Sequence, residues 1–443
     1  LQARLTLAEN AGIITEDGVV WIVHTDVETF GGDGGALVEI RCANPQLVDS
    51  AFNAGVCVFA GNALGLGTAT LNGDNKPNYV LQLNGVTLEN REIRLEGIAS
   101  SSSTRSFRNT GTNVIKGLFN VKAGSANYFL GAEGATLTLE GGVSFAVGTN
   151  RTRVDRAWYD GSTIVVKTVP AALEKPVLVD NGAFRFETSG NVVRKGIFLG
   201  GDRVLTTTAD HAFVFGATES SVAGIGFVEG TKTAKWDLAG TEQELQILAG
   251  VGKGTITSEQ PATLTLDASH TFNGDQGASY SDSAPTFLTK IYVSSTSTLE
   301  VPIKEAQQTD NVSFRGAVSL VKKGASPHYA GGVSTSTGSL SVAGGRYVFL
   351  EGASWKTASG VALSNDGVLE VTSSGVLSAK TPISITGEEN GRISIPSGKT
   401  LRCASLTVNG VMCAEGELLT SGVVTGGGTL KVGKCGGQLI IVR

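Results

Sequence analysis

The chain has 443 residues, of which 60 are Gly, 45 Thr, 38 Ser and 10 Pro; 41% are hydrophobic, 17% are charged, and the net charge is −5. These values exclude a collagen, which needs Gly at every third position and many prolines, and a disordered chain, which has too few apolar residues to form a core. The sequence has no run of 18 apolar residues and no sustained helical period, so we expect no membrane span and no helical bundle, and its scattered basic residues give no field for nucleic acid.

The N-terminal stretch resembles a strand, because Leu5 and Leu7 alternate with polar residues. The first residue is Leu1, and the only methionine is Met412. Together with few cysteines, few charges and many threonines, this indicates an exported protein whose signal peptide is absent from the sequence. We therefore expect an extracellular or bacterial cell-surface location.

Residues 1–112 have a less regular pattern than the rest and contain Cys42, Cys57 and a short helical candidate over 45–53. We interpret residues 1–112 as a divergent, β-rich region that forms a cap or an interaction module. The acidic loop over 26–33 lacks the repeated Gly and Asp pattern of a calcium roll, so solvated turns explain it better than a bound cation.

Short apolar-alternating segments separated by Gly, Asn or Asp dominate residues 113–443. Segments such as Thr136–Leu139 and Thr263–Leu266 place Leu in a core and Thr on the surface. Two architectures fit such strands: a β-sandwich or barrel, and a solenoid with coils of about 20–25 residues. The length without a linker, the short strands and the 6% aromatic content favour an all-β parallel solenoid.

A basic and aromatic cluster is our candidate glycan-binding site. Trp158, Tyr159 and Asp160 follow Arg153 and Arg156 in the sequence. Aromatic faces can cover sugar rings, while Arg and Asp can bind their hydroxyls. In the alternative interpretation the aromatic residues cover the edge of a coil and the arginines lie in solvated turns.

Residues 236–267 read WDLAGTEQELQILAGVGKGTITSEQPATLTLD. Asp237, Leu238, Gly240 and Gln243 begin a segment that resembles the autotransporter-associated β-strand repeat proteins. Further elements of that family have degraded counterparts at 314–324 and 329–348, and the resemblance covers about 113–443. It implies a right-handed parallel β-helix on the cell surface, and it implies no catalytic residues.

No constellation of catalytic residues is evident. The glycine-rich run over 250–254 lacks the phosphate-loop motif and is interpreted as a β-turn, and a Glu pair at 388–389 is interpreted as a turn. The histidines lie outside metal and catalytic motifs, and we interpret them as surface or turn residues: His24, His211, His270 and His328. We predict no catalytic residue, no metal and no cofactor.

The five cysteines show no C-x-x-C spacing, which argues against a zinc or redox motif. A single bridge between Cys42 and Cys57, or between Cys403 and Cys413, remains open beside the interpretation that they are small buried side chains.

The C-terminal residues Leu439, Ile440, Ile441 and Val442 are apolar and β-prone. A solenoid exposes a strand edge at each end, and unpaired edges associate. With Leu5 and Leu7, these residues predict head-to-tail self-assembly. The alternative is that 439–442 closes the last coil of its own chain.

The sequence therefore predicts a secreted structural β-solenoid rather than an enzyme: a component of an extracellular fibre or surface layer, with self-assembly and adhesion. Its partners would be copies of the same chain and host or matrix glycans. The alternative function is a carbohydrate-active parallel β-helix, either a polysaccharide lyase or a hydrolase, or a non-catalytic glycan-binding surface protein.

Overall fold

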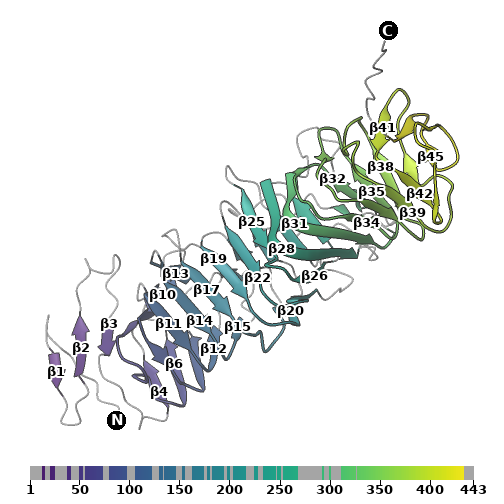
Figure 1. The fold of residues 1–443 in the computed structure, drawn as a ribbon. Helices are drawn as coiled ribbons and strands as arrows, with labels where there is room; N and C mark the ends of the chain where they lie inside the picture. The colour runs from purple at the N-terminus through teal and green to yellow at the C-terminus, as the bar shows by residue number, and fades with distance from the viewer. Residues whose placement is uncertain are drawn as a thin grey trace. The chain divides into compact units, whose positions relative to one another are not determined.

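Figure 1 shows the computed structural model of the chain. It describes residues 49–52, 55–72, 79–96, 105–121, 129–132, 134–145, 152–154, 162–173, 177–179, 182–193, 197–199, 203–215, 224–227, 233–245, 247–250, 253–267, 311–325 and 327–433, together with the strands at 12–14, 20–24, 37–40, 292–293 and 299–300. The regular elements of this part are all β-strands. It therefore contains no helix that could cross a membrane.

The chain divides into two compact units. Unit 1 comprises 1–199 and 203–212, and unit 2 comprises 200–202 and 213–443. The boundary expected after residue 112 falls within a strand of unit 1, Thr112–Ile115, and a separate N-terminal region stays a prediction.

Unit 1 is built from ladders of parallel strands (Figure 1). One ladder contains β3 (Leu37–Ile40), β5 (Gly55–Val58), β7 (Tyr79–Asn84), β10 (Arg105–Thr110) and β13 (Phe129–Gly131). It is preceded by β1 (Gly12–Ile14) and β2 (Val20–His24), which pair antiparallel. A second ladder contains β4 (Ser50–Phe52), β6 (Thr68–Asn72), β9 (Glu92–Glu96), β12 (Leu118–Val121) and β15 (Val143–Phe145).

The third ladder of unit 1 is the longest in its described part. It contains β8 (Thr87–Leu88), β11 (Thr112–Ile115), β14 (Thr136–Leu139), β17 (Thr163–Val166), β19 (Ala183–Phe186) and β22 (Val204–Thr207). A fourth set contains β16 (Thr152–Val154), β18 (Val177–Val179) and β21 (Ile197–Leu199), and β20 covers Asn191–Val193. Partners in successive coils of unit 1 lie 18–27 positions apart, as in Leu37 with Gly55 and Thr138 with Val165.

Unit 2 continues the same architecture. Its main ladder contains β25 (Ala234–Asp237), β28 (Lys253–Asp267), β31 (Asn311–Lys323), β34 (Leu340–Val342), β37 (Val361–Leu363), β39 (Ile383–Ile385) and β42 (Leu406–Val408). It is joined by β26 (Glu242–Leu245), parallel to β28, and ends with β43 (Val411–Met412), antiparallel to β42.

A second ladder of unit 2 contains β32 (His328–Ala330), β35 (Arg346–Phe349), β38 (Val368–Val371), β40 (Ile393–Ser394) and β45 (Val424–Thr425). Shorter parallel pairs are β24 (Gly224–Phe227) with β27 (Ile247–Gly250), β33 (Val333–Ser334) with β36 (Ser354–Trp355), and β41 (Thr400–Cys403) with β46 (Thr429–Val432). β44 (Leu418–Leu419) and the pair β29 (Tyr292–Val293) and β30 (Leu299–Glu300) are antiparallel, and β23 covers Phe213–Phe215.

The parallel β-solenoid expected from the sequence is thus confirmed. The core follows the expected alternation, since Leu137 and Leu139 of β14 are 0% and 1% exposed while Thr136 and Thr138 are half-buried. β28 repeats this pattern over its second half, with Leu264 and Leu266 buried. Each fully buried Leu contributes about 1.5–3 kcal/mol, so the aliphatic columns are the main source of stability.

One expectation about the core was wrong. The narrow core was expected to accept few large aromatics, yet Trp236, Trp355 and Tyr347 are among its most deeply buried side chains. Trp355 stacks on Phe314 at 5.4 Å between ring centroids, so a wide inward position is filled from two coils at once. Val411 and Leu418 are 71% and 61% exposed, and they lie in the antiparallel strands β43 and β44.

Some glycines are required by the close approach of successive coils. A Cβ on Gly338 would lie 2.0 Å from the carbonyl oxygen of Val318 in the preceding coil. A Cβ on Gly360, in the next coil, would meet only Pro382, at 3.6 Å, which is ordinary contact. Neither glycine has a positive φ, so the two differ in their packing and not in a need for the left-handed backbone conformation.

We predict that Gly338→Ala lowers the free energy of unfolding by about 2 kcal/mol, because the methyl group forces two backbones apart. Gly360→Ala should leave it unchanged within about 0.5 kcal/mol or raise it slightly, since Ala restricts the unfolded chain. Urea unfolding of the two variants and the parent chain measures both effects. Equal stabilities of the two variants would contradict the packing argument.

Candidate functional site

The site residues predicted from the sequence lie outside the described part of the chain, with one exception. Those predicted for self-assembly are Leu5, Leu7, Leu439, Ile440, Ile441 and Val442, and those predicted for glycan binding include Trp158, Tyr159, Asp160 and Arg156. The backbone of Arg153 forms part of β16, and nothing more of this residue is described. The acidic loop over 26–33 also lies outside. These assignments stay predictions.

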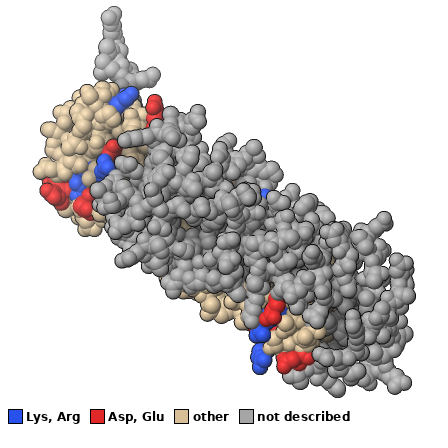
Figure 2. All heavy atoms as spheres, turned by 180° about the vertical axis from the view of Figure 1, so that it is seen from behind, with Lys and Arg blue, Asp and Glu red and all other residues tan. Residues whose placement is uncertain are grey.

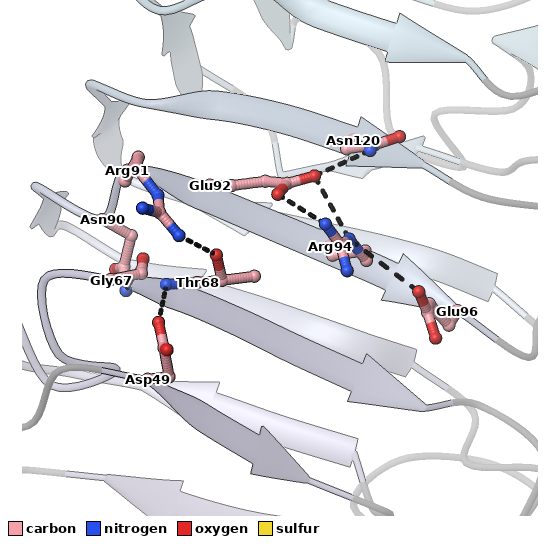
Figure 3. A network of polar contacts seen from close by, with 9 residues as sticks. All are labelled: Asp49, Gly67, Thr68, Asn90, Arg91, Glu92, Arg94, Glu96 and Asn120. Atoms are coloured by element: carbon pink, nitrogen blue, oxygen red, sulfur yellow. Dashed lines mark hydrogen bonds and ion pairs between the residues drawn. The ribbon is translucent and has the colours of Figure 1, made fainter.

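The most extensive described polar network lies in unit 1, on the ladder of β4, β6, β9 and β12 (Figure 3). Glu92 accepts hydrogen bonds from Arg94 Nη2 at 2.7 Å and Nε at 3.2 Å, and from Asn120 Nδ2 on β12 at 2.7 Å. Arg94 also lies 3.8 Å from Glu96. This forked pairing raises the pKa of Arg94, chiefly through the hydrogen bond to Glu92.

The same network continues toward the start of the ladder. Arg91 Nη2 donates to the Thr68 hydroxyl at 3.1 Å, and the Thr68 amide donates to Asp49 Oδ1 at 2.6 Å (Figure 3). Charges of both signs are adjacent on β9. In Figure 2, acidic residues (red) likewise lie beside basic residues (blue) where described residues are coloured. The carboxylate of Glu92 is occupied by donors from two strands, so the row ties successive coils together on the surface.

Buried asparagines serve the corners of the coils. Asn113 accepts from the Val86 amide at 2.7 Å and donates to the carbonyl of Thr110 at 2.9 Å. Asn191 accepts from the Val169 amide at 2.9 Å and donates to the carbonyl of Ala212 at 2.9 Å. Backbone groups at a corner are left over by the ladders, and buried ones must be paired. These side chains therefore have a structural role.

Lys322 is the most unusual ionisable group of unit 2. It is 0% exposed, and its Nζ donates to the carbonyls of Lys323 at 2.6 Å, Gly324 at 2.8 Å and Gly344 at 3.0 Å. Burial lowers its pKa to about 8, against the opposite effect of Asp267 and Asp366. The sequence held a signal for it, because Lys322 follows Val318 and Leu320 in the inward phase of β31.

Arg392 fills a second buried cationic position. It is 3% exposed, and it donates from Nε to the carbonyl of Gly367 and from Nη1 to that of Glu388, both at 2.7 Å. Burial lowers its pKa, while Asp366 and Glu388 oppose this effect. Both buried cations thus bind turn carbonyls of their own chain. Glu388 and Glu389, expected in a turn, are exposed between β39 and β40.

His328 was expected on the surface or in a turn, and this prediction was wrong. Its side chain is 4% exposed and lies against the Tyr347 ring at 5.4 Å between centroids. His328 lies in β32, which pairs with β35, and its imidazole is buried in the core. Burial lowers its pKa to about 3, with a smaller contribution from Lys322. His211, by contrast, lies exposed in a turn as expected.

The cysteines described in unit 2 are thiols. Cys403 is buried on β41 and Cys413 follows β43, so the bridge considered between them is absent from this structure. Burial raises the pKa of Cys403 to about 11 and also raises that of Cys413. Both therefore stay protonated at neutral pH and are poor nucleophiles. In unit 1, Cys57 is buried on β5, which fits the interpretation as a small core residue.

The described residues contain no group of three or more His, Cys, Asp or Glu side chains placed to hold a metal ion. Comparisons with protein-family models, curated proteins and solved structures found no match. The resemblance to the autotransporter-associated β-strand repeats therefore rests on the motifs alone and stays a prediction.

We predict that the unfolding free energy rises with pH between about 8 and 10.5. In this window Lys322 is deprotonated in the native state but protonated in the unfolded state, so the unfolded state binds more protons and loses stability as pH rises. Lys322→Met should abolish this contribution, which amounts to about 3 kcal/mol over the full window. It should also destabilise the chain at pH 7, because three carbonyls lose their donor. Urea unfolding at several pH values measures both, and parallel pH profiles would contradict the assignment.

We predict that acid lowers the stability of the folded chain through the titration of His328. Below pH 6.5 the unfolded imidazole binds a proton that the buried one excludes down to about pH 3, so stability falls as the pH falls through this range. The expected loss is about 1.4 kcal/mol per pH unit at most. His328→Phe should keep the ring contact with Tyr347 and flatten the acid limb of thermal melts recorded from pH 7 to 4. An unchanged acid limb in His328→Phe would refute this origin.

Proposed function

We propose that this protein is a secreted structural β-solenoid that serves as a component of an extracellular fibre or surface layer. The observation that carries the proposal is which side chains fill the interior of the coils. In the described part of both units the buried positions are filled mainly by aliphatic and aromatic side chains, and the buried Asn113, Lys322 and Arg392 bind backbone groups at turns. A scaffold needs this arrangement, whereas an enzyme needs polar groups that converge on an open cleft.

The outward positions support the same proposal. The rows of Thr, Ser and paired charges repeat from coil to coil, as in Thr112, Thr136 and Thr163, which are register partners. Such a surface is soluble and regular, and it suits repeated weak contacts with a matrix. Adhesion to host or matrix glycans is part of the proposal, and the cluster from Arg153 to Asp160 is its candidate site.

Export to the cell surface is likewise proposed. The supporting features are the few cysteines and charges and the motifs shared with the autotransporter-associated repeats. Burial of Cys57 and Cys403 also fits, because exposed thiols would oxidise outside the cell.

We expect the purified chain to release no product from pectin, alginate or host glycans over a day at pH 5 to 9, with a commercial pectate lyase as positive control. Negative-stain images of the same sample should show solenoid particles or fibres. Product formation that depends on the folded chain would replace the scaffold with the carbohydrate-active alternative.

A second arm tests glycan binding. The triple variant Trp158→Ala, Arg153→Ala, Arg156→Ala should lose retention on a glycan array, and Lys380→Ala with Lys399→Ala, two exposed cations in unit 2, serves as control. Retention that the triple variant keeps would place adhesion elsewhere on the molecule.

A further inference from the structure

Two free thiols occur in the described part of unit 2. Cys403 is the last residue of β41 and is 0% exposed, whereas Cys413 directly follows β43 and is half-buried. The free thiol described in unit 1, Cys57, lies alone on β5. Whether the first two can react with each other depends on where the fold places their side chains.

The short hairpin of β42 and β43 turns Cys413 toward the interior of the coil. Met412 is the register partner of Thr407 in this antiparallel pair. The amide of the next residue, Cys413, donates to the carbonyl of Leu406 at 2.9 Å. Because successive residues of a strand point to opposite sides, Cys413 lies on the same side as Leu406, which is 0% exposed.

The turn after Cys413 leads to the strand that lies against Cys403. The Gly416 amide donates to the carbonyl of Val432 at 2.8 Å. Val432 is in turn the register partner of Cys403 in the parallel pair of β41 and β46, and paired strands lie about 4.8 Å apart. Cys413 is therefore tied on one side to Leu406, three positions after Cys403, and on the other side to the residue paired with Cys403.

The electrostatics of the two thiols agree with this placement. Burial raises the pKa of Cys403 to about 11, and Cys413 contributes to the rise. One ionisable group raises the pKa of another in this way only when the two lie near each other. The pKa of Cys413 is also raised, by burial first and then by Glu417 and Glu389. The pair therefore stays reduced at neutral pH until an oxidant reaches it.

We propose that Cys403 and Cys413 form a disulfide when the chain meets a low-molecular-mass disulfide, and that this bond locks β43 to β41. Cys413, the more exposed of the two, gives its proton to the solvent and attacks one sulfur of the oxidant. The oxidant's S–S bond breaks, and one small thiolate leaves and takes up a proton. Cys403 then loses its proton, attacks the Cys413 sulfur and displaces the second small thiolate. Two protein thiols are oxidised, and one small disulfide is reduced to two thiols.

The end position of β43 suits such a lock. A disulfide needs the two Cα atoms within about 7 Å of each other. β43 has two residues and, in the described strand order, a neighbour on one side only, so it can move to meet this need. The bond closes the loop over 403–413 and so opposes the local opening of β43. The inference stands apart from the proposed function, because it concerns these thiols whether or not the protein forms fibres.

Thiol mapping of the full chain tests the bond. The folded protein is treated with oxidised glutathione at about pH 8.5, the remaining thiols are alkylated in denaturant, and the chain is digested with trypsin. Both cysteines lie in one tryptic peptide, 403–431, which should lose two hydrogens and take no alkyl group. In Cys403→Ser the reaction should stop at a glutathione adduct on Cys413, and in Cys413→Ser the buried Cys403 should stay a thiol.

Hydrogen–deuterium exchange tests the lock. Oxidation of the parent should slow exchange in peptides that cover 409–414 at least tenfold, and dithiothreitol should restore the original rate. Cys57→Ala, which removes a thiol outside the pair, should respond as the parent does. Far-UV circular dichroism verifies that each variant keeps its β-structure.

Two free thiols in the folded parent, under conditions that oxidise the same chain in urea, would overturn the proposal. A glutathione adduct that persists on Cys413 of the parent, or a bond that joins two chains, would also overturn it, because Cys403 would then be out of reach. Exchange over 409–414 that stays unchanged after the bond forms would refute the lock. A bond within one chain that needs both cysteines and slows this exchange would establish it.

Discussion

Parallel hydrogen bonding between successive coils is the constraint on which the rest of this structure depends. Once each residue pairs with the residue above it, an inward position stays inward through the ladder. One column of unit 1 shows this directly, since its members are register partners and all are buried: Leu88, Ile115, Leu139, Val166, Phe186 and Thr207. Stability is then the sum of coil contributions and nearest-neighbour contacts, and a defect acts on the coils beside it.

The regular pairing between strands does not extend to the corners of the coils. A ladder satisfies the backbone within strands, but each turn leaves amides and carbonyls that need other partners. The chain meets this need with buried polar side chains. Asn113 and Asn191 bind both an amide and a carbonyl, whereas Lys322 and Arg392 bind carbonyls alone. Ionisable groups that would suggest chemistry in another fold are here part of the backbone's hydrogen bonding, and this is why we favour a scaffold.

Local alternation allowed much of the fold to be predicted, and long-range pairing explains what it missed. The two TLTL segments, Thr136–Leu139 and Thr263–Leu266, follow from the period of two. His328 could not be placed, because its burial is imposed by Tyr347 on a strand 19 positions later. The exposure of Val411 was equally hidden, since no local pattern says that the chain reverses there into an antiparallel strand. Apart from the backbone of Arg153 in β16, the predicted glycan and assembly residues lie outside the described part of the chain.

The ends of a solenoid differ from its middle, because a strand at an end has a paired neighbour on one side only. Along the described ladders the strands between the first and the last are paired on both sides. In the described strands each unit contains an interruption of the parallel order, unit 1 at β1 and β2 and unit 2 at β43. An antiparallel end strand changes the direction that a newcomer must take, and a strand of two residues such as β43 offers few hydrogen bonds to a foreign chain.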